Sequence, residues 1–289
     1  ITGVILNDMD YYSYGPGSNK ILWVAAKSGI GRTVGFDPKN PSTTASPANW
    51  IFPLYPSGAP ATAIAVHQTN ANVVFAGYNS GHMFKTVTGK NLQSTNIIWY
   101  EVFNARNFTN VFPELPEYTT ISDIAFVPSS PSNMFASAYR WQPPMTNGGV
   151  FYSHNEGQTW EVGLSNEPVN GLYVSDIATW AGIGSEDSSG RGLRVRQREA
   201  HWWNPGTGLE LDNQIVNDLD GAQLGSSLTV YCAAAGGVHK AFMPDLSLST
   251  GWSSWTWTDL TPNVGYWNTN FTAVTVNPDD PNEAYLSAG

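Results

Sequence analysis

The sequence predicts an all-β protein built from repeated four-stranded antiparallel sheets. One observation is a repeated phrase, in which an apolar stretch, a polar turn rich in Asn or Pro and a second apolar stretch follow one another at 62–77, 122–138 and 272–289. The other is the spread of 28 glycines and 19 prolines between short runs rich in Val, Ile, Phe, Tyr and Trp, which is typical of strands. Because units repeating every roughly 40–60 residues stack or arrange radially, we expect one β-propeller domain over residues 1–289.

The repeated phrase predicts where each blade begins. If it forms the first two strands of a unit, the first strands lie near Val4, Ile64, Ile124, Ile177, Leu228 and Val274. In four units, a third strand and a fourth strand opening on tryptophan follow, at 31–34 and 50–52, 82–86 and 99–102, 149–153 and 160–162, and 237–241 and 257–260. A ring of this size buries about 150–250 Å2. We therefore expect these tryptophans to fill the same space between neighbouring sheets.

The last unit is expected to be incomplete. Residues 274–289 align with residues 4–29, which already form the first two strands of their own blade. The sequence therefore predicts five blades and part of a sixth. Since an open sheet edge favours aggregation, we expect the protein to continue beyond this sequence or another chain to complete the ring. The start at Ile1, without Met or a leader, is expected of a processed product or an excised piece.

A polar hairpin is predicted at 153–160, with the sequence S-H-N-E-G-Q-T-W. The short side chain of Asn155 suits acceptance of backbone N–H groups across the turn, and Gly157 suits a positive φ. Thr159 continues the strand, and Trp160 is expected to anchor the hairpin in its blade.

This hairpin resembles the Asp-box, S-x-D-x-G-x-T-W, of BNR-type propellers, with Asn155 where that family usually has Asp. The whole pattern is similar to secreted BNR and sortilin-like propellers and to xyloglucanase-type glycoside hydrolases. In the hydrolases an early T-G-V/I strand precedes a Y/W-A-x-x-G-x-G strand, as 1–4 and 22–31 do here. The resemblance implies a propeller in which the hairpin stabilises the fold through Ser153, Asn155, Gly157, Thr159 and Trp160.

Two aspartates are the candidates for catalysis. Asp123 and Asp176 occupy identical Ser-Asp-Ile-Ala settings in consecutive predicted blades. Equivalent positions would place the carboxylates about 6–10 Å apart, the separation of an inverting acid and base pair. The alternative is that each Ser-Asp step satisfies loop N–H groups where a strand starts.

The resemblance itself argues against hydrolysis. The hydrolases have a catalytic Asp in the loop entering the second blade, where residues 55–62 contain no carboxylate. Those enzymes also use two propellers facing each other. A sialidase needs three arginines around its substrate and an F-R-I-P stretch, which 36–38 does not match.

Aromatic residues in loop contexts are the candidates for ligand binding: Trp141, Trp202, Trp203 and Trp267. Indole faces flanked by Asn, Gln and Asp suit stacking on sugar rings or a protein hot spot. The alternative is that these side chains cover blade edges.

Composition excludes several functional classes. The net charge of −10 disfavours nucleic acid, because phosphate binding needs Lys and Arg; the arginines at 191–198 are expected on an exposed strand. A single cysteine, Cys232, and few histidines indicate no metal site and no cofactor. No apolar run reaches the roughly 18 residues of a membrane span. Only 12% of residues are charged, and a polar but uncharged surface is common on secreted and cell-surface proteins.

Two functional hypotheses follow. The first is a noncatalytic β-propeller module of a secreted or cell-surface protein, whose partners are a glycan, another protein, further domains or copies of itself. The alternative is a xyloglucanase-type glycoside hydrolase acting on a β-glucan-like polysaccharide, with Asp123 and Asp176 as acid and base.

Overall fold

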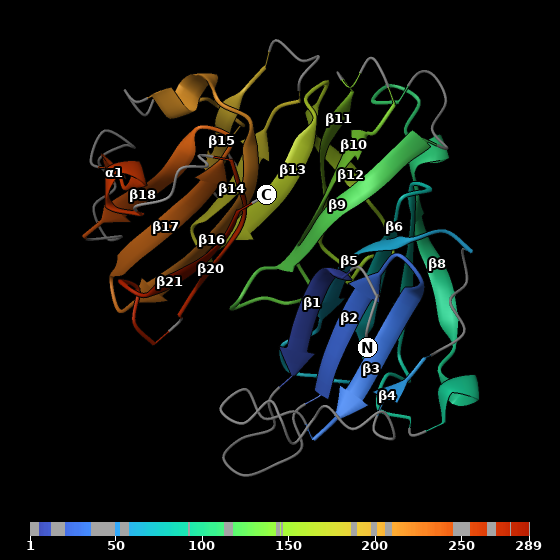
Figure 1. The fold of residues 1–289 in the computed structure, drawn as a ribbon. Helices are drawn as coiled ribbons and strands as arrows, with labels where there is room; N and C mark the ends of the chain where they lie inside the picture. Colours follow the sequence, from blue (N-terminus) through green and yellow to red (C-terminus); the bar gives the residue numbers. More distant parts are fainter. Residues whose placement is uncertain are drawn as a thin grey trace. The chain divides into compact units, whose positions relative to one another are not determined.

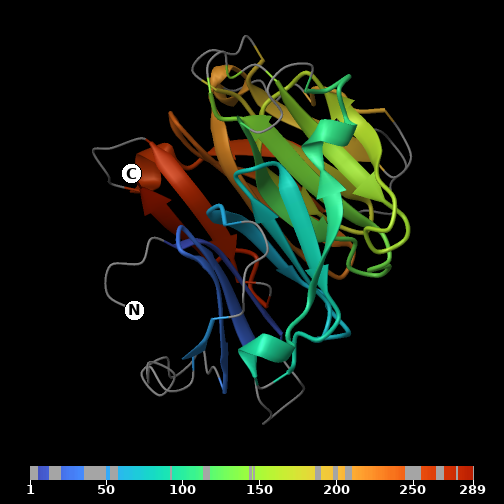
Figure 2. The ribbon, with the colours of Figure 1, turned by 90° about the vertical axis from the view of Figure 1, so that its right-hand side faces the viewer.

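The protein is almost entirely β-sheet, as predicted. The computed structural model describes residues 6–12, 21–35, 50–52, 58–91, 93–112, 118–142, 145, 147–185, 190–197, 201–205, 210–244, 255–264, 270–277 and 279–288. Helical segments within these ranges are single short turns (Figures 1 and 2). They are η3 (Ser94–Asn96), η4 (Ala105–Asn107), η6 (Glu210–Asn213) and α1 (Thr261–Val264).

Six antiparallel sheets form among the described residues, and in each the strands are hydrogen-bonded in chain order. The first sheet contains β1 (Leu6–Tyr12), β2 (Ile21–Ala26), β3 (Gly29–Val34) and β4 (Trp50–Ile51). The second contains β5 (Ala61–Val66), β6 (Val74–Tyr78), β7 (His82–Thr86) and β8 (Trp99–Asn104). The third contains β9 (Thr119–Phe126), β10 (Met134–Arg140), β11 (Gly148–Ser153) and β12 (Glu161–Ser165).

The later sheets are less regular. The fourth has three strands, β13 (Val169–Val174), β14 (Ala178–Ile183) and β15 (Gly192–Gln197). The fifth has four, β16 (Val216–Leu224), β17 (Ser227–Ala234), β18 (Gly237–Met243) and β19 (Thr256–Asp259). The sixth has two, β20 (Phe271–Val276) and β21 (Ala284–Ala288). Five blades and part of a sixth are thus present, as predicted.

The chain forms two compact units, Ile1–Trp141 with Phe151–Glu161, and Gln142–Val150 with Val162–Gly289. In the first unit, a buried core between the first and second sheets contains Trp23, Ile64 and Tyr78. In the second unit, one core contains residues of the fourth and fifth sheets, and another contains residues of the fifth and sixth. Apolar packing between successive sheets therefore provides the stability of each unit.

The tryptophans at the fourth strands lie between neighbouring sheets. Trp99 packs edge-on against Trp23 of the preceding sheet, with ring centroids 6.0 Å apart. Trp257 meets Trp180 in the same way at 5.9 Å, and Trp160 meets Phe103 at 5.7 Å. The prediction that a large ring fills this space is confirmed for these three sheets.

The fourth sheet has a further tryptophan of this kind, Trp203. Trp203 forms an isolated bridge with Val195 of β15, at the edge where the four-stranded sheets have a fourth strand. Two backbone hydrogen bonds of 3.0 and 3.1 Å join the pair. The half-buried indole packs against the core that contains Trp180. Trp203 therefore takes the place of a fourth-strand tryptophan.

Two predicted first strands were wrong. Ile64, Ile124 and Val274 lie in first strands, and Val4 lies outside the described residues. Ile177, however, lies in the turn between β13 and β14, and Leu228 lies in the second strand β17. The true first strand of the fifth sheet, β16, reads V-N-D-L-D-G-A-Q-L. The polar residues of β16 interrupt the apolar pattern by which the other first strands were predicted.

Candidate functional site

The two candidate catalytic aspartates occupy different structural positions. Asp123 lies within β9, half-buried, and its Oδ1 accepts the backbone N–H of Ile124 at 2.7 Å. Asp176 is exposed in the turn between β13 and β14. The expectation of equivalent positions was therefore wrong. A catalytic role for either residue stays a prediction.

The turn at Asp176 is formed by the preceding serine. Ser175 Oγ accepts the backbone N–H of Ala178 at 3.2 Å and donates to the Ala178 carbonyl at 3.1 Å. The backbone N–H of Ser175 also donates to that carbonyl, at 2.9 Å. These bonds close a tight turn, as short serine side chains often do, so the same four-residue sequence is a strand at 122–125 and a turn at 175–178.

A polar motif on the first strands was missed by the sequence analysis. The sequence N-D-x-D occurs in β1, at Asn7–Asp10, and again in β16, at Asn217–Asp220. The four carboxylates, here called the bridging aspartates, are Asp8, Asp10, Asp218 and Asp220. Each accepts a backbone N–H from the first strand of the next sheet, at 2.7–2.9 Å. The recipients are Ile64 and Val66 of β5, and Val274 and Val276 of β20.

The two copies of the motif have the same geometry. Each aspartate-to-backbone bond spans 56 residues in both copies. The asparagines donate to the same two strands over 54 residues, Asn7 to the carbonyl of Ala61 and Asn217 to that of Phe271. Side chains thus satisfy the edges of β5 and β20, where backbone groups would otherwise lack partners. A search for repeated polar tetrapeptides would have found this motif.

The bridging aspartates lie in an enclosed environment. Burial raises the pKa of Asp8 well above its usual range, the charge of Asp123 raises it further, and the N–H of Ile64 opposes the shift. Burial likewise raises the pKa of Asp220, against hydrogen bonds from Val276 and Gly221. Both oxygens of Asp8 accept backbone N–H groups, from Met9 at 2.7 Å and Ile64 at 2.8 Å. The carboxylate therefore acts as a structural acceptor.

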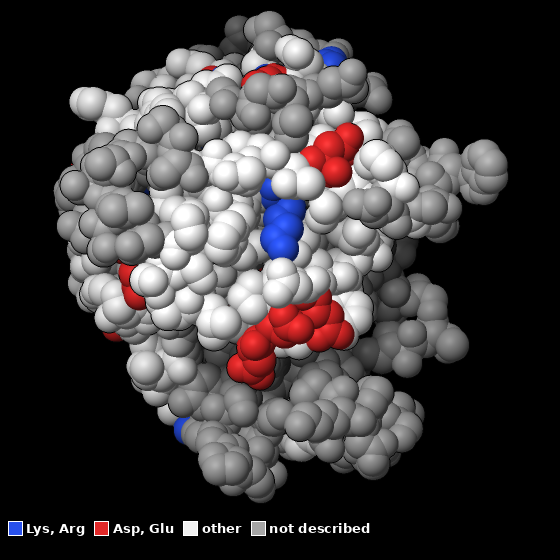
Figure 3. Space-filling model, turned by 90° about the vertical axis from the view of Figure 1, so that its left-hand side faces the viewer, with Lys and Arg blue, Asp and Glu red and all other residues white. Residues whose placement is uncertain are grey.

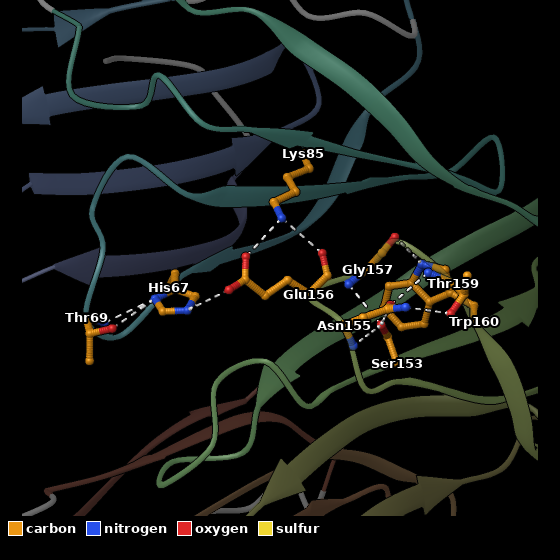
Figure 4. A network of polar contacts seen from close by, with 9 residues as sticks. All are labelled: His67, Thr69, Lys85, Ser153, Asn155, Glu156, Gly157, Thr159 and Trp160. Carbon is orange, nitrogen blue, oxygen red and sulfur yellow. Dashed lines mark hydrogen bonds and ion pairs between the residues drawn. The ribbon is translucent and has the colours of Figure 1, made fainter.

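The hairpin at 153–160 has the internal contacts that its sequence predicts (Figure 4). Asn155 Oδ1 accepts the backbone N–H of Thr159 at 2.9 Å, and its amide donates to Thr159 Oγ1 at 2.8 Å. Ser153 Oγ accepts the N–H of Gly157 at 2.9 Å, and Gly157 has a φ of 77°. The indole N–H of Trp160 donates to the Gly157 carbonyl at 3.1 Å. The short polar side chains thus hold the turn closed.

The hairpin docks on the second sheet through Glu156. Its carboxylate and its carbonyl both accept from Lys85 Nζ at 3.1 Å (Figure 4). His67 lies 3.9 Å from the same carboxylate, and burial lowers the pKa of its imidazole. Lys85 also lies 5.3 Å above the ring of Phe75, which Gly157 packs against. The charged and aromatic residues of this group stabilise the contact between successive sheets.

Replacing Gly157 with alanine tests this docking. The positive φ strains any other residue, and an added Cβ would lie 2.7 Å from the Phe75 ring. We expect Gly157→Ala to lower the free energy of unfolding by about 1–3 kcal/mol in urea denaturation. Gly225→Ala is the matched control, since Gly225 has a φ of +60° with nothing within 4 Å. Equal losses in the two variants would show that the Phe75 contact contributes nothing.

The predicted ligand-binding tryptophans have different surroundings. Trp141 is 38% exposed, its indole N–H donates to the Asn79 carbonyl at 3.2 Å, and Tyr118 meets its ring edge-on at 5.4 Å. Trp202 and Trp203 are half-buried. Trp267 lies outside the described residues. Of the three candidate tryptophans that the structure describes, Trp141 alone therefore combines an exposed face with a fixed orientation.

The remaining sequence expectations concern the cysteine, metal binding, membrane spans and surface charge. Cys232 is buried, and burial raises the pKa of its thiol well above the usual range. In the described part of the chain, no group of three or more His, Cys, Asp or Glu side chains is arranged to hold a metal ion. None of the helices among those residues has the length and apolarity to cross a bilayer. Among the described residues on the face drawn in Figure 3, Lys, Arg, Asp and Glu form small separate patches between uncharged residues.

The fold is that of known β-propellers. An ancestral GH74 enzyme superposes with a TM-score of 0.63 at 17% identity, over 99% of this chain and 35% of that one. The GH74 xyloglucanase from Xanthomonas campestris gives 0.64 at 12% identity, over 96% and 43%. YCF48 bound to D1 peptide gives 0.55 at 14% identity, over 99% and 75%. The chain thus spans less than half the length of each of the two enzymes.

The amino-acid sequence adds no family assignment to this likeness. No family model matches it. No curated protein matches it either. The likeness to solved structures therefore shows that the chain has the β-propeller fold, and the function must be inferred from the residues of this chain.

Proposed function

We propose that this chain is a noncatalytic β-propeller module of a secreted or cell-surface protein, and that it binds a glycan or another protein through Trp141. The observation that carries this proposal is the fixed, exposed indole. The Asn79 carbonyl accepts the indole N–H, and the Tyr118 ring packs perpendicular to the indole. Because these contacts already fix the Trp141 side chain, it loses little conformational freedom on binding. Rigid aromatic faces of this kind stack on sugar rings or form the centre of protein hot spots.

The use of the polar residues supports a module without catalysis. The bridging aspartates bind backbone N–H groups of the next sheet, and the Glu156 carboxylate binds Lys85. The hairpin supports membership of the BNR/Asp-box propellers, in which this motif stabilises the fold. A peptide-bound structure of YCF48 is among the similar propellers, which supports a protein ligand as the counterpart to a glycan.

The experiment is a binding screen on a glycan array and a peptide array, with the intact chain and two variants. We expect Trp141→Ala to weaken binding by tenfold or more, since loss of an aromatic hot-spot residue costs about 2 kcal/mol. Tyr100→Ala removes an aromatic side chain that is also exposed, on β8, and is expected to leave binding unchanged. Equal binding by the Trp141→Ala variant and the intact chain would rule out this site.

A glycoside hydrolase is the second candidate, favoured by the likeness to two GH74 structures. It requires Asp123 and Asp176 to act as acid and base despite their different positions. We expect no turnover of xyloglucan or other β-glucans. Hydrolysis that is lost in Asp123→Asn or Asp176→Asn, with the circular dichroism spectrum retained, would replace the binding proposal with the enzymatic one.

A further inference from the structure

The second strand of the sixth sheet is exposed, unlike every other second strand. All residues of β2, β6 and β14 are buried. In β21, four of the five residues are exposed, including Tyr285 at 60% and Leu286 at 36%. In the other five sheets a third strand pairs with the second, whereas no described residue pairs with the outer edge of β21. Among the described residues, the sixth sheet therefore has an open apolar edge.

A lysine beside this edge matches the lysine that receives the hairpin in the first unit. Lys85 pairs with Phe75 across β7 and β6, and Lys240 pairs with Tyr231 across β18 and β17. Each ammonium lies 5.3 Å above its partner ring. Lys85 is neutralised by Glu156 (Figure 4). Lys240 donates to Asn282 Oδ1 at 3.0 Å, and no described carboxylate forms an ion pair with it.

The turn that precedes β21 also matches the turn beneath the hairpin. In the third sheet, backbone bonds run from Val127 to Asn133, Ser130 to Val127 and Asn133 to Ser130. The sixth sheet repeats them from Asn277 to Glu283, Asp280 to Asn277 and Glu283 to Asp280. This equivalence places Asn282 at the position of Ser132, whose carbonyl accepts the N–H of Glu156 at 2.8 Å.

The same alignment explains the exposed tyrosine. Tyr285 takes the position of Phe135 on β10, which is 9% exposed. Phe135 is covered in part by Tyr152 of the third strand β11, with ring centroids 6.4 Å apart. The lysine on β18 of the fifth sheet and the turn carbonyl and aromatic ring of the sixth sheet thus match the groups that receive a hairpin in the first unit, and no such hairpin is found among the described residues.

We propose that the open edge of β21, with Lys240, the Asn282 carbonyl and Tyr285, is a docking surface for a β-hairpin. The hairpin adds the third and fourth strands of the sixth sheet. An aromatic residue on its first strand covers Tyr285, a backbone N–H in its turn donates to Asn282, and a carboxylate beside that N–H binds Lys240. These are the roles of Tyr152 and Glu156 in the third sheet. The proposal is independent of ligand binding at Trp141.

The test uses a backbone-cyclised peptide with the sequence of residues 148–165, so that the hairpin is preformed. We expect it to bind the intact chain saturably in calorimetry and to slow amide exchange at 284–288. Lys240→Glu is expected to weaken binding about tenfold, the effect of leaving a charge partner unpaired at an interface. Lys27→Glu, which makes the same charge change on the exposed β2–β3 turn, is expected to leave it unchanged.

A charge swap separates this contact from general attraction. A peptide with lysine in place of the glutamate equivalent to Glu156 should bind the intact chain weakly and regain affinity for the Lys240→Glu variant. Absence of binding, equal binding by the Lys240→Glu variant, or protection of β6 and β7 in place of β21 would each overturn the proposal. A dimer that protects 284–288 without dependence on Lys240 would also overturn it, with a second copy as the occupant.

Discussion

Replacing Trp180 with alanine is expected to lower the free energy of unfolding by about 3–5 kcal/mol, the range for deleting a buried tryptophan side chain. Trp180 is fully buried in β14 and meets the rings of Trp255 at 4.8 Å and Trp257 at 5.9 Å. Its loss leaves a cavity between the fourth and fifth sheets and removes two edge-on aromatic contacts, each worth about 0.5–1.5 kcal/mol. The midpoint of urea unfolding, at unchanged slope, measures the effect.

Trp141→Ala is the matched control for this experiment. The same side chain is removed from a position that is 38% exposed, so we expect a loss of about 1 kcal/mol or less. If Trp180→Ala proves too unstable to purify, Trp180→Phe keeps part of the ring contact and should give an intermediate value. Equal losses at positions 180 and 141 would show that the tryptophans between sheets do not determine stability.

Replacing Asp220 with alanine is the second large effect that we expect. Its carboxylate accepts the backbone N–H of Gly221 at 2.7 Å, that of Val276 at 2.8 Å and the hydroxyl of Thr275 at 3.2 Å. Removing the carboxylate leaves the buried N–H of Val276 on β20 and the half-buried N–H of Gly221 on β16 without this acceptor. We expect a loss of about 2–4 kcal/mol, because each unsatisfied buried donor costs about 1–3 kcal/mol. Asp279→Ala, at an exposed turn position, should cost less than about 0.5 kcal/mol.

The same carboxyl makes stability depend on pH. Burial raises the pKa of Asp220 in the folded protein above its value in the unfolded chain, so the folded state holds the proton more tightly. Its contribution to stability is therefore fully present below the unfolded pKa of about 4 and is lost as pH rises through the raised folded pKa. Unfolding curves across that window should show a steeper fall for the intact chain than for Asp220→Asn. A steeper fall in the variant would contradict the assignment.

The sequence predicted the parts of the fold that are local and apolar. The hairpin at 153–160 was predicted together with the acceptor role of Asn155 and the positive φ of Gly157, because both residues act within a single turn. The third and fourth strands followed from the position of their tryptophans. The first strand β16 was missed because Asp218 and Asp220 interrupt its apolar pattern, and their partners lie 56 residues away.

The candidate site was harder to predict for the same reason. Asp123 and Asp176 share a four-residue sequence, but a serine side chain turns the chain at one copy while a neighbouring strand pairs at the other. A short sequence alone cannot distinguish these outcomes. Trp203 looked like a loop residue because its strand consists of a single bridge. Its place in the fourth sheet depends on a partner in β15 that periodicity does not reveal.

The hydrogen bonding of strands in chain order has a consequence for synthesis. Within each sheet, every strand pairs with the strand before it or after it in the chain. Each pairing therefore joins segments that leave the ribosome within a few dozen residues of one another. Short sequence separations speed folding and favour growth from the amino terminus as translation proceeds. Each folded sheet can then offer its apolar face to the sheet that follows it in the chain. In a nascent chain that stalls between sheets, the last sheet formed is the one whose face is still uncovered.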